Sequence, residues 1–417
     1  MSDITAQHTD NGAALLVEKI SGVNSAALTW LVPFGHAHDP ENQLGRAAVV
    51  SEALMRGDQK RDSKQQADAF DRLGATRSID PSKRFMRFAA TVLADRLPEL
   101  AELFADNLLR PRFEDAAITA AKDLAGQSLA SIEDDPQTLA VLGARERHHP
   151  APLNRTGYGT QEGIDAVTRD AAVESWHAAA RPEGAIISVA GAVDASGVKS
   201  IFDAALAEWK GTPPGFDIGA DAPRGYAHRE DAEANQVQIV VVHDGPNEND
   251  PNAVKERLIT AVLSGGMSGR LFTEVREKRG LCYAVSASFA AEKDRGTTTA
   301  YVGTTPERAQ DSLDVLVEQL LHITTPEGAI TPDEFERAVI GMKSRFVFSG
   351  ESSAARSAAI ASDWHRIGRV RSLDEMAAAI DAVTLDELND YAKTRTLGRV
   401  TVQTLGPRAL DVPKDIA

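Results

Sequence analysis

The sequence contains a single cysteine, Cys282, so no disulfide can form within the chain. This scarcity fits a protein that works in a reducing compartment. No run of apolar residues approaches the roughly 20 that a helix needs to cross a bilayer. The first residues also lack a basic stretch followed by a long apolar core, which argues against a signal peptide. We therefore expect a cytoplasmic protein with no membrane partner.

Positive charge is also in short supply. The chain has 45 Lys and Arg against 61 Asp and Glu, which gives a net charge of −16. Such a balance argues against duplex nucleic acid or an anionic membrane as the partner. The acidic residues are spread along the chain rather than gathered in a tail, so we interpret them as a solvated surface.

The length of 417 residues exceeds what one ordinary hydrophobic core holds, so two or more domains are expected. Residues 211–225 combine Gly, Pro and Asp without periodicity, which is typical of a linker. Residues 1–210 and 226–417 show the same predicted order of elements: paired strands, helices, a strand, more helices and a closing strand. We therefore predict an α+β protein of two homologous halves that arose by internal duplication.

One stretch, residues 263–288, combines a helix, a tight stop and a strand. Charged and apolar residues alternate at helical spacing up to Gly280, which is placed as the glycine that ends a helix. Beyond it, alternation predicts a strand in which Cys282 shares one face with Ala284 and Tyr283 lies on the other. Taken alone, Arg276 is a solvated helix charge, Tyr283 a core aromatic residue and Cys282 a small buried residue.

The segment SGRLFTEVREKRGLCYAV, residues 268–285, resembles the C-terminal-half motif of the insulinase, pitrilysin and mitochondrial processing peptidase family. Weaker matches follow in the order that this family shows. They are LTWLVPFGHAHDPENQLG at 28–45, SKQQADAFDRLGAT at 63–76, IEDDP at 132–136 and HHPAPLNRTGYGTQEGI at 148–164. The resemblance implies that each half is a mainly antiparallel sheet flanked by helices.

Active members of that family carry an inverted zinc motif, H-x-x-E-H, on a helix just before a glycine. Two histidines four residues apart lie on one helical face and bind one zinc ion, while the glutamate between them acts as a general base. Counted back from Gly57, the three motif positions hold Ala48, Ser51 and Glu52. None of the ten histidines has another histidine three or four residues away. A serine cannot serve as the general base near neutral pH.

The family's third ligand is a glutamate, and this chain has none near the corresponding position, which is occupied by Gln127, Ser128 and Leu129. We therefore expect that this chain binds no metal and is inactive alone. Glu52 is interpreted as an ordinary helix carboxylate.

Some peptidases of the family consist of two half-length chains. One chain holds zinc, and the other contributes an Arg/Tyr pair from its C-terminal half. The resemblance maps that pair onto Arg276 and Tyr283. It implies a substrate-binding subunit of a heterodimeric zinc metallopeptidase, with a homologous zinc-bearing partner and a peptide or unfolded polypeptide as substrate. The alternative is a degenerate member that acts as a structural or assembly scaffold without a role in proteolysis.

Overall fold

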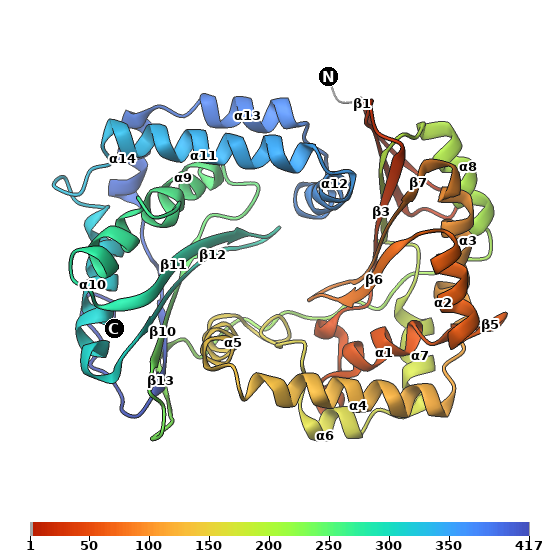
Figure 1. The fold of residues 1–417 in the computed structure, drawn as a ribbon, viewed down its shortest axis with the longest axis horizontal. Coiled ribbons are helices and arrows are strands. Elements are labelled where there is room, and N and C mark those ends of the chain that lie inside the picture. Colours follow the sequence, from red (N-terminus) through yellow and green to blue (C-terminus); the bar gives the residue numbers. More distant parts are fainter. Residues whose placement is uncertain (1–2, 417) are drawn as a thin grey trace. The chain divides into compact units, whose positions relative to one another are not determined.

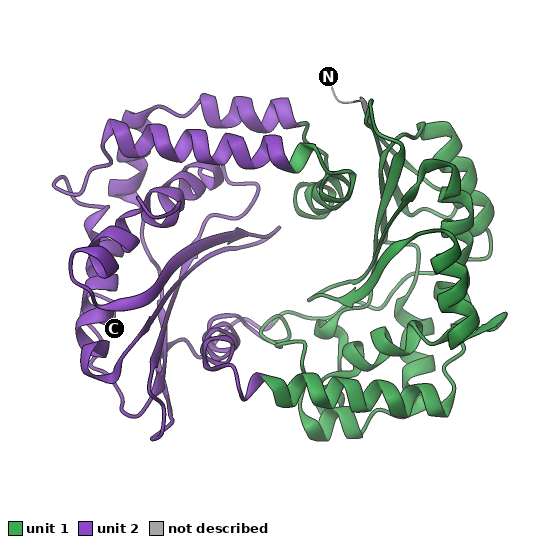
Figure 2. Cartoon of the chain, in the orientation of Figure 1, with its two compact units in different colours: residues 1–131, 151–218, 349–372 green, residues 132–150, 219–348, 373–417 purple. Residues whose placement is uncertain are grey.

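The computed structural model describes residues 3–416, which form two compact units, and we describe each unit by itself (Figure 2). Unit 1 consists of the described residues up to 131 together with 151–218 and 349–372, and unit 2 consists of the rest. The boundary after residue 218 lies inside the predicted linker, 211–225. Segment 132–150 comes from the N-terminal half of the sequence but belongs to unit 2. Segment 349–372 comes from the C-terminal half but belongs to unit 1.

Unit 1 is built on a six-stranded sheet in the order β1-β2-β8-β3-β7-β6. Figure 1 labels four of these strands, β1, β3, β7 and β6. Strands β2 and β8 run parallel, and the other neighbours run antiparallel. A two-stranded ladder, β4-β5, stands apart. The strands are β1 (Asp3–His8), β2 (Ala14–Lys19), β3 (Ser25–Val32), β4 (Gly57–Asp58), β5 (Arg61–Asp62), β6 (Thr76–Pro81), β7 (Met86–Leu93) and β8 (Ile186–Gly191).

Helices cover both faces of this sheet. Leu15 and Val17 of β2 point into the large core, whereas Leu16 points to the opposite face and packs under α12. The helices of unit 1 are η1 (His36–His38), η2 (Glu41–Gln43), α1 (Arg46–Leu54), α2 (Ser63–Arg72), η3 (Ala94–Arg96), α3 (Leu97–Leu109), α4 (Asp115–Ile132, whose last residue belongs to unit 2), α6 (Gln161–Asp165), α7 (Arg169–Ala179), α8 (Ala195–Ala205) and α12 (Ser353–Ile367).

Unit 2 repeats this plan with five strands in the order β11-β12-β10-β13-β9, of which only β9 and β13 run parallel. Helix α5 covers one face, and α9 and α10 contact the sheet from the large core of the unit. The elements are α5 (Pro136–His148), β9 (Gly225–Glu230), β10 (Val237–Gly245), α9 (Ala253–Ser264), η4 (Phe272–Glu277), β11 (Cys282–Ala291), β12 (Gly296–Thr304), η5 (Pro306–Arg308), α10 (Ala309–His322), α11 (Pro332–Gly350), α13 (Leu373–Asp381), α14 (Leu385–Thr394) and β13 (Thr401–Gly406).

The two sheets have matching topologies, because β2, β8, β3, β7 and β6 correspond in order and direction to β9, β13, β10, β12 and β11. The predicted α+β class with two similar halves is therefore confirmed. The sequence pattern missed β1, β4, β5 and β9, of which β9 begins at the last residue of the predicted linker. None of the helices within residues 3–416 combines the length and apolarity that a membrane crossing requires.

Candidate functional site

The segment around Arg276 and Tyr283 lies in unit 2, where a helix leads into the edge strand of the sheet. Residues Phe272–Glu277 form a π-helical turn whose Val275 side chain is fully buried. The turn ends at Gly280, which has a φ of 60°. This left-handed conformation is readily available only to glycine, so the predicted helix stop is confirmed.

Strand β11 contains a β-bulge at Tyr283. Cys282 pairs with Thr304 and Ala284 with the next residue, Gly303, so Tyr283 has no partner of its own. The predicted alternation is therefore wrong at this point: Cys282 points into the core together with Val285 rather than sharing a face with Ala284. A bulge turns a side chain away from the face that regular pleating would give it. Tyr283 is 69% exposed instead of lying in the core.

Arg276 is tied to this bulge. Its Nη1 donates a hydrogen bond of 2.8 Å to the backbone carbonyl of Tyr283. Its guanidinium also lies 4.9 Å from the centre of the Phe272 ring, within range of a cation–π interaction. The Tyr283 hydroxyl makes no hydrogen bond to any residue within 3–416. The structure thus holds the arginine and leaves the phenol available to a ligand.

Glu274, an acidic side chain of the same turn, is already neutralised by others. Glu274 accepts hydrogen bonds from Lys278 and Arg279, and the Lys278 contact contributes most to lowering the pKa of this carboxyl. Arg276 forms no ion pair with the described residues. Burial raises the pKa of Cys282, so its thiol is the inert, partly packed group that the sequence indicated.

The three positions onto which the resemblance maps the zinc motif lie on α1 in unit 1. Ala48 packs against the core, and Ser51 is buried, with its Oγ donating a hydrogen bond of 3.1 Å to the carbonyl of Ile79 in β6. Glu52 is half-buried and has no hydrogen-bond or ion-pair partner among the described residues. The serine at the general-base position therefore fastens the helix to the edge strand of its sheet.

These residues do not fit a zinc ion. Zinc in a protein takes three or four nitrogen, sulfur or carboxylate ligands, and here one carboxylate stands beside a methyl group and a hydroxyl that is already hydrogen-bonded. Throughout residues 3–416, no three or more His, Cys, Asp and Glu side chains come together in a group able to hold a metal ion.

The loop before α1 contains polar groups that the sequence pattern did not single out. Asp39 is buried and accepts hydrogen bonds from the amides of Gly45 and Ala47, at 3.1 and 3.0 Å, so it caps the start of α1. Burial raises the pKa of Asp39 to about 7, despite the nearby Arg46. An aspartate shortly before the predicted helix was the available signal in the sequence. Because several residues separate Asp39 from that helix, the pattern did not show that its carboxylate reaches the first helix amides.

The fold consists of two matching sheets, each packed against helices, and within residues 3–416 no cluster of His, Cys, Asp and Glu is able to hold a metal. Residues 14–155 match the model of the insulinase family, peptidase family M16, and residues 166–342 match that of the peptidase M16 inactive domain. The chain belongs to this family.

Relatives described as uncharacterized zinc proteases match this chain over most of their length. An uncharacterized zinc protease of Bacillus subtilis, YmxG, is 24% identical over 92% of this chain and 93% of its own length. An uncharacterized zinc protease of Mycobacterium bovis is 26% identical over 95% of this chain and 91% of its own.

Solved structures show the same fold. A peptidase M16 inactive domain from Pseudomonas fluorescens matches with a TM-score of 0.84 at 21% identity, covering 99% of each chain. A protease from Helicobacter pylori matches with a TM-score of 0.84 at 16% identity, covering 97% of this chain and 100% of its own. A chain of complex III from Candida albicans matches with a TM-score of 0.82 at 15% identity, covering 97% and 96%.

Proposed function

We propose that this chain is the non-catalytic, substrate-binding subunit of a heterodimeric zinc metallopeptidase, whose zinc is held by a homologous partner. The single observation that carries the proposal is the exposed Tyr283, with a free hydroxyl, held beside Arg276 at the bulge. A protein that kept only the family's scaffold would have no need to expose this aromatic side chain.

Each side chain has a chemical role that suits its setting. The guanidinium of Arg276 has further N–H groups that can bind a substrate carbonyl or a C-terminal carboxylate. The phenol of Tyr283 can donate a hydrogen bond to the scissile carbonyl and stabilise the oxyanion that forms on it. Because Arg276 also holds the Tyr283 carbonyl, it positions the tyrosine as well as offering a contact of its own.

The edge strand supports peptide binding as well. β11 is the outermost strand of its sheet and, among the described residues, pairs with β12 alone. An extended peptide can add to such an edge through main-chain hydrogen bonds. Small side chains on the strand keep the edge accessible, since Ala284, Ser286, Ser288 and Ala290 are all exposed.

The test is co-expression with a homologous chain that has an intact H-x-x-E-H motif, followed by an assay of peptide cleavage. Tyr283→Phe should lower kcat by about 100- to 1000-fold, because one oxyanion donor is lost. Arg276→Ala should lower turnover and also raise KM. Arg279→Ala is the matched control, because this neighbouring arginine is paired with Glu274. Unchanged turnover in the first two variants would refute the proposal.

The scaffold alternative makes a different forecast. A chain that serves only in assembly would show no affinity for peptides and no gain of cleavage with any zinc-bearing partner. Its variants at Arg276 and Tyr283 would then behave like the Arg279 control in every assay. We propose the cytoplasm as the location, because a single cysteine fits a reducing compartment.

A further inference from the structure

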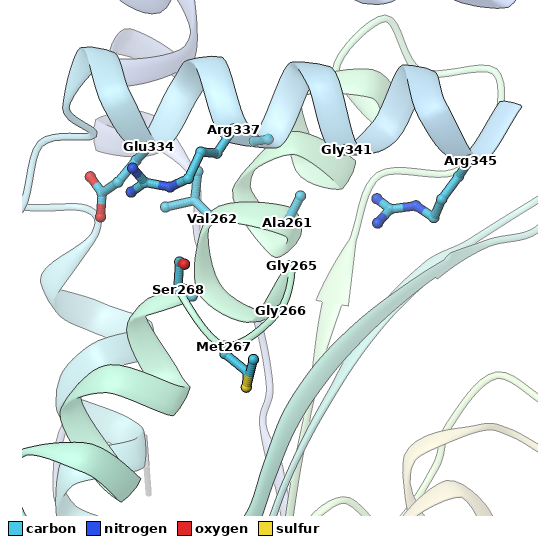
Figure 3. Close-up of a pocket in the computed structure, with 12 residues that line it drawn as sticks. Ala261, Val262, Gly265, Gly266, Met267, Ser268, Glu334, Arg337, Gly341 and Arg345 are labelled. Carbon is cyan, nitrogen blue, oxygen red and sulfur yellow. The ribbon is translucent and has the colours of Figure 1, made fainter. Parts of the chain in front are cut away.

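A pocket in unit 2 lies between the glycine-rich loop 265–269, which follows α9, and helix α11 (Figure 3). Arg337 and Arg345 line it from the helix, with Gly341 between them. These three residues are spaced by four, so they form one stripe along α11 that faces the loop. The pocket involves neither Arg276 nor Tyr283.

The two arginines have no acidic partner. Neither guanidinium makes an ion pair or hydrogen bond with a residue in the described part of the chain. Glu334 is three residues from Arg337 but is held by Arg270, through contacts of 2.7 and 2.8 Å. Although burial opposes it, the hydrogen bond from Arg270 lowers the pKa of Glu334 to about 2, so this carboxylate stays charged and engaged. Two unpaired cations in one pocket are unexpected in a chain of net charge −16.

The opposite wall also offers hydrogen-bond donors. The backbone N–H groups of Gly266, Met267 and Ser268 donate to no acceptor within residues 3–416. Met267 is 78% exposed and adds an apolar contact beside them. At Gly341, an added Cβ would meet nothing within 4 Å, so the floor between the arginines is open.

We propose that this pocket binds an acidic, extended segment of a peptide substrate, with carboxylates at positions i and i+4. The eight helical steps from Arg337 to Arg345 span about 12 Å along the helix. Four residues of extended chain span about 13 Å and return to the same face, so one carboxylate reaches each guanidinium. The central residue of the three between the two carboxylates lies over Gly341. A single phosphate group is too small to bridge this distance.

This inference rests on the proposed function in that the occupant belongs to a peptide substrate, but it is tested without a partner subunit. The probe is a fluorescein-labelled nine-residue peptide with glutamate at its third and seventh positions and alanine and valine between them. Its anisotropy is measured with the full chain alone. Changing both glutamates to glutamine should weaken binding about tenfold. Added salt should weaken the binding of the acidic peptide more than that of the glutamine peptide.

Two variants test the site itself. The double substitution Arg337→Gln with Arg345→Gln should weaken binding of the acidic peptide about tenfold. Gly341→Glu should abolish the preference for the acidic peptide, because the new carboxylate pairs with both arginines along the helix. This second variant should keep or raise the Tm, since glutamate favours a helix more than glycine does. The matched control is Arg399→Gln with Lys414→Gln, which removes two positive charges from residues that do not line the pocket.

The inference is overturned if the acidic and neutral peptides bind equally, if both pocket variants bind the acidic peptide as the native chain does, or if inorganic phosphate displaces the peptide more than chloride at equal ionic strength. Failure of the proposed function would show differently. In that case the pocket variants lose peptide affinity, while Arg276→Ala and Tyr283→Phe leave the turnover of the complex unchanged.

Discussion

His243 in β10 provides a test of the polar core of unit 2 through the pH dependence of stability. Its ring is fully buried, with Nδ1 at 2.8 Å from the carbonyl of Asp244 and Nε2 at 3.2 Å from Nη2 of Arg395. These contacts require a neutral imidazole that donates from Nδ1 and accepts at Nε2. Burial first, and then the charge of Arg395, lower the pKa of His243 from 6.5 to about 4, although Glu256 lies nearby.

The sign of the effect follows from proton binding in the two states. Between pH 6.5 and about 4, the unfolded chain binds a proton at His243 that the folded chain refuses, so stability falls as the pH falls. At pH 5 the loss amounts to about 1.5 pH units times 1.36 kcal/mol, or roughly 2 kcal/mol. Below about pH 4 the loss levels off, because both states are protonated.

The assay compares urea denaturation at pH 7.5 and pH 5.0 for the native chain, for His243→Gln and for the control His322→Gln in the same unit. For His243→Gln, the difference in unfolding free energy between pH 7.5 and pH 5.0 should be about 2 kcal/mol smaller than for the native chain. The variant should also be less stable than the native chain at pH 7.5. The control should keep the full pH dependence. Equal pH dependence in the native chain and His243→Gln would refute the reasoning, because some other group would then carry the effect.

Three further changes test local contacts. Arg356→Ala should lower the free energy of unfolding by about 3–5 kcal/mol in urea denaturation, because it leaves buried Glu18 without its ion-pair partner, which lies 2.8 Å away. Replacing both residues by methionine should restore most of the loss. Ser51→Ala should cost about 1 kcal/mol in the same assay, through loss of the hydrogen bond to Ile79, and no loss at all would contradict the contact. Gly280→Ala should lower the unfolding free energy by about 1–2 kcal/mol through backbone strain alone, since an added Cβ meets nothing within 4 Å. The control Gly341→Ala on α11, where an added Cβ also meets nothing within 4 Å, should show no such loss.

Much of the fold could be predicted because local patterns decide it. The helix stop at Gly280 follows from one residue type with a unique conformational range, and α3 and α10 follow from apolar spacing. The strands that were missed lack such signals: β4 and β5 have two residues each, and β9 is largely exposed or half-buried. The matching order of predicted elements was enough to reveal the repeat, which the two sheet topologies display in full.

The sheets on which α5 and α12 pack could not be predicted from the sequence. Helical periodicity shows that a helix has an apolar face, but it does not show which sheet covers that face. α12 packs on the sheet of unit 1 through an apolar cluster and also through polar contacts, such as Arg356 to Glu18 and the Ser357 hydroxyl to that of Thr29 at 2.8 Å. The first of these pairs is separated by 338 residues in the sequence. No local pattern relates residues at that distance.

The site shows the same division between what is local and what is not. The resemblance placed Arg276 and Tyr283 seven residues apart across a helix stop, which made them candidates, but strand alternation assigned the tyrosine to the core. Only pairing with β12 creates the bulge that turns it outward, and only then does the Tyr283 carbonyl leave the ladder and accept a hydrogen bond from Arg276. The two residues therefore act as one unit. Their substitutions should be strongly non-additive, because removing the arginine already releases the backbone that orients the phenol.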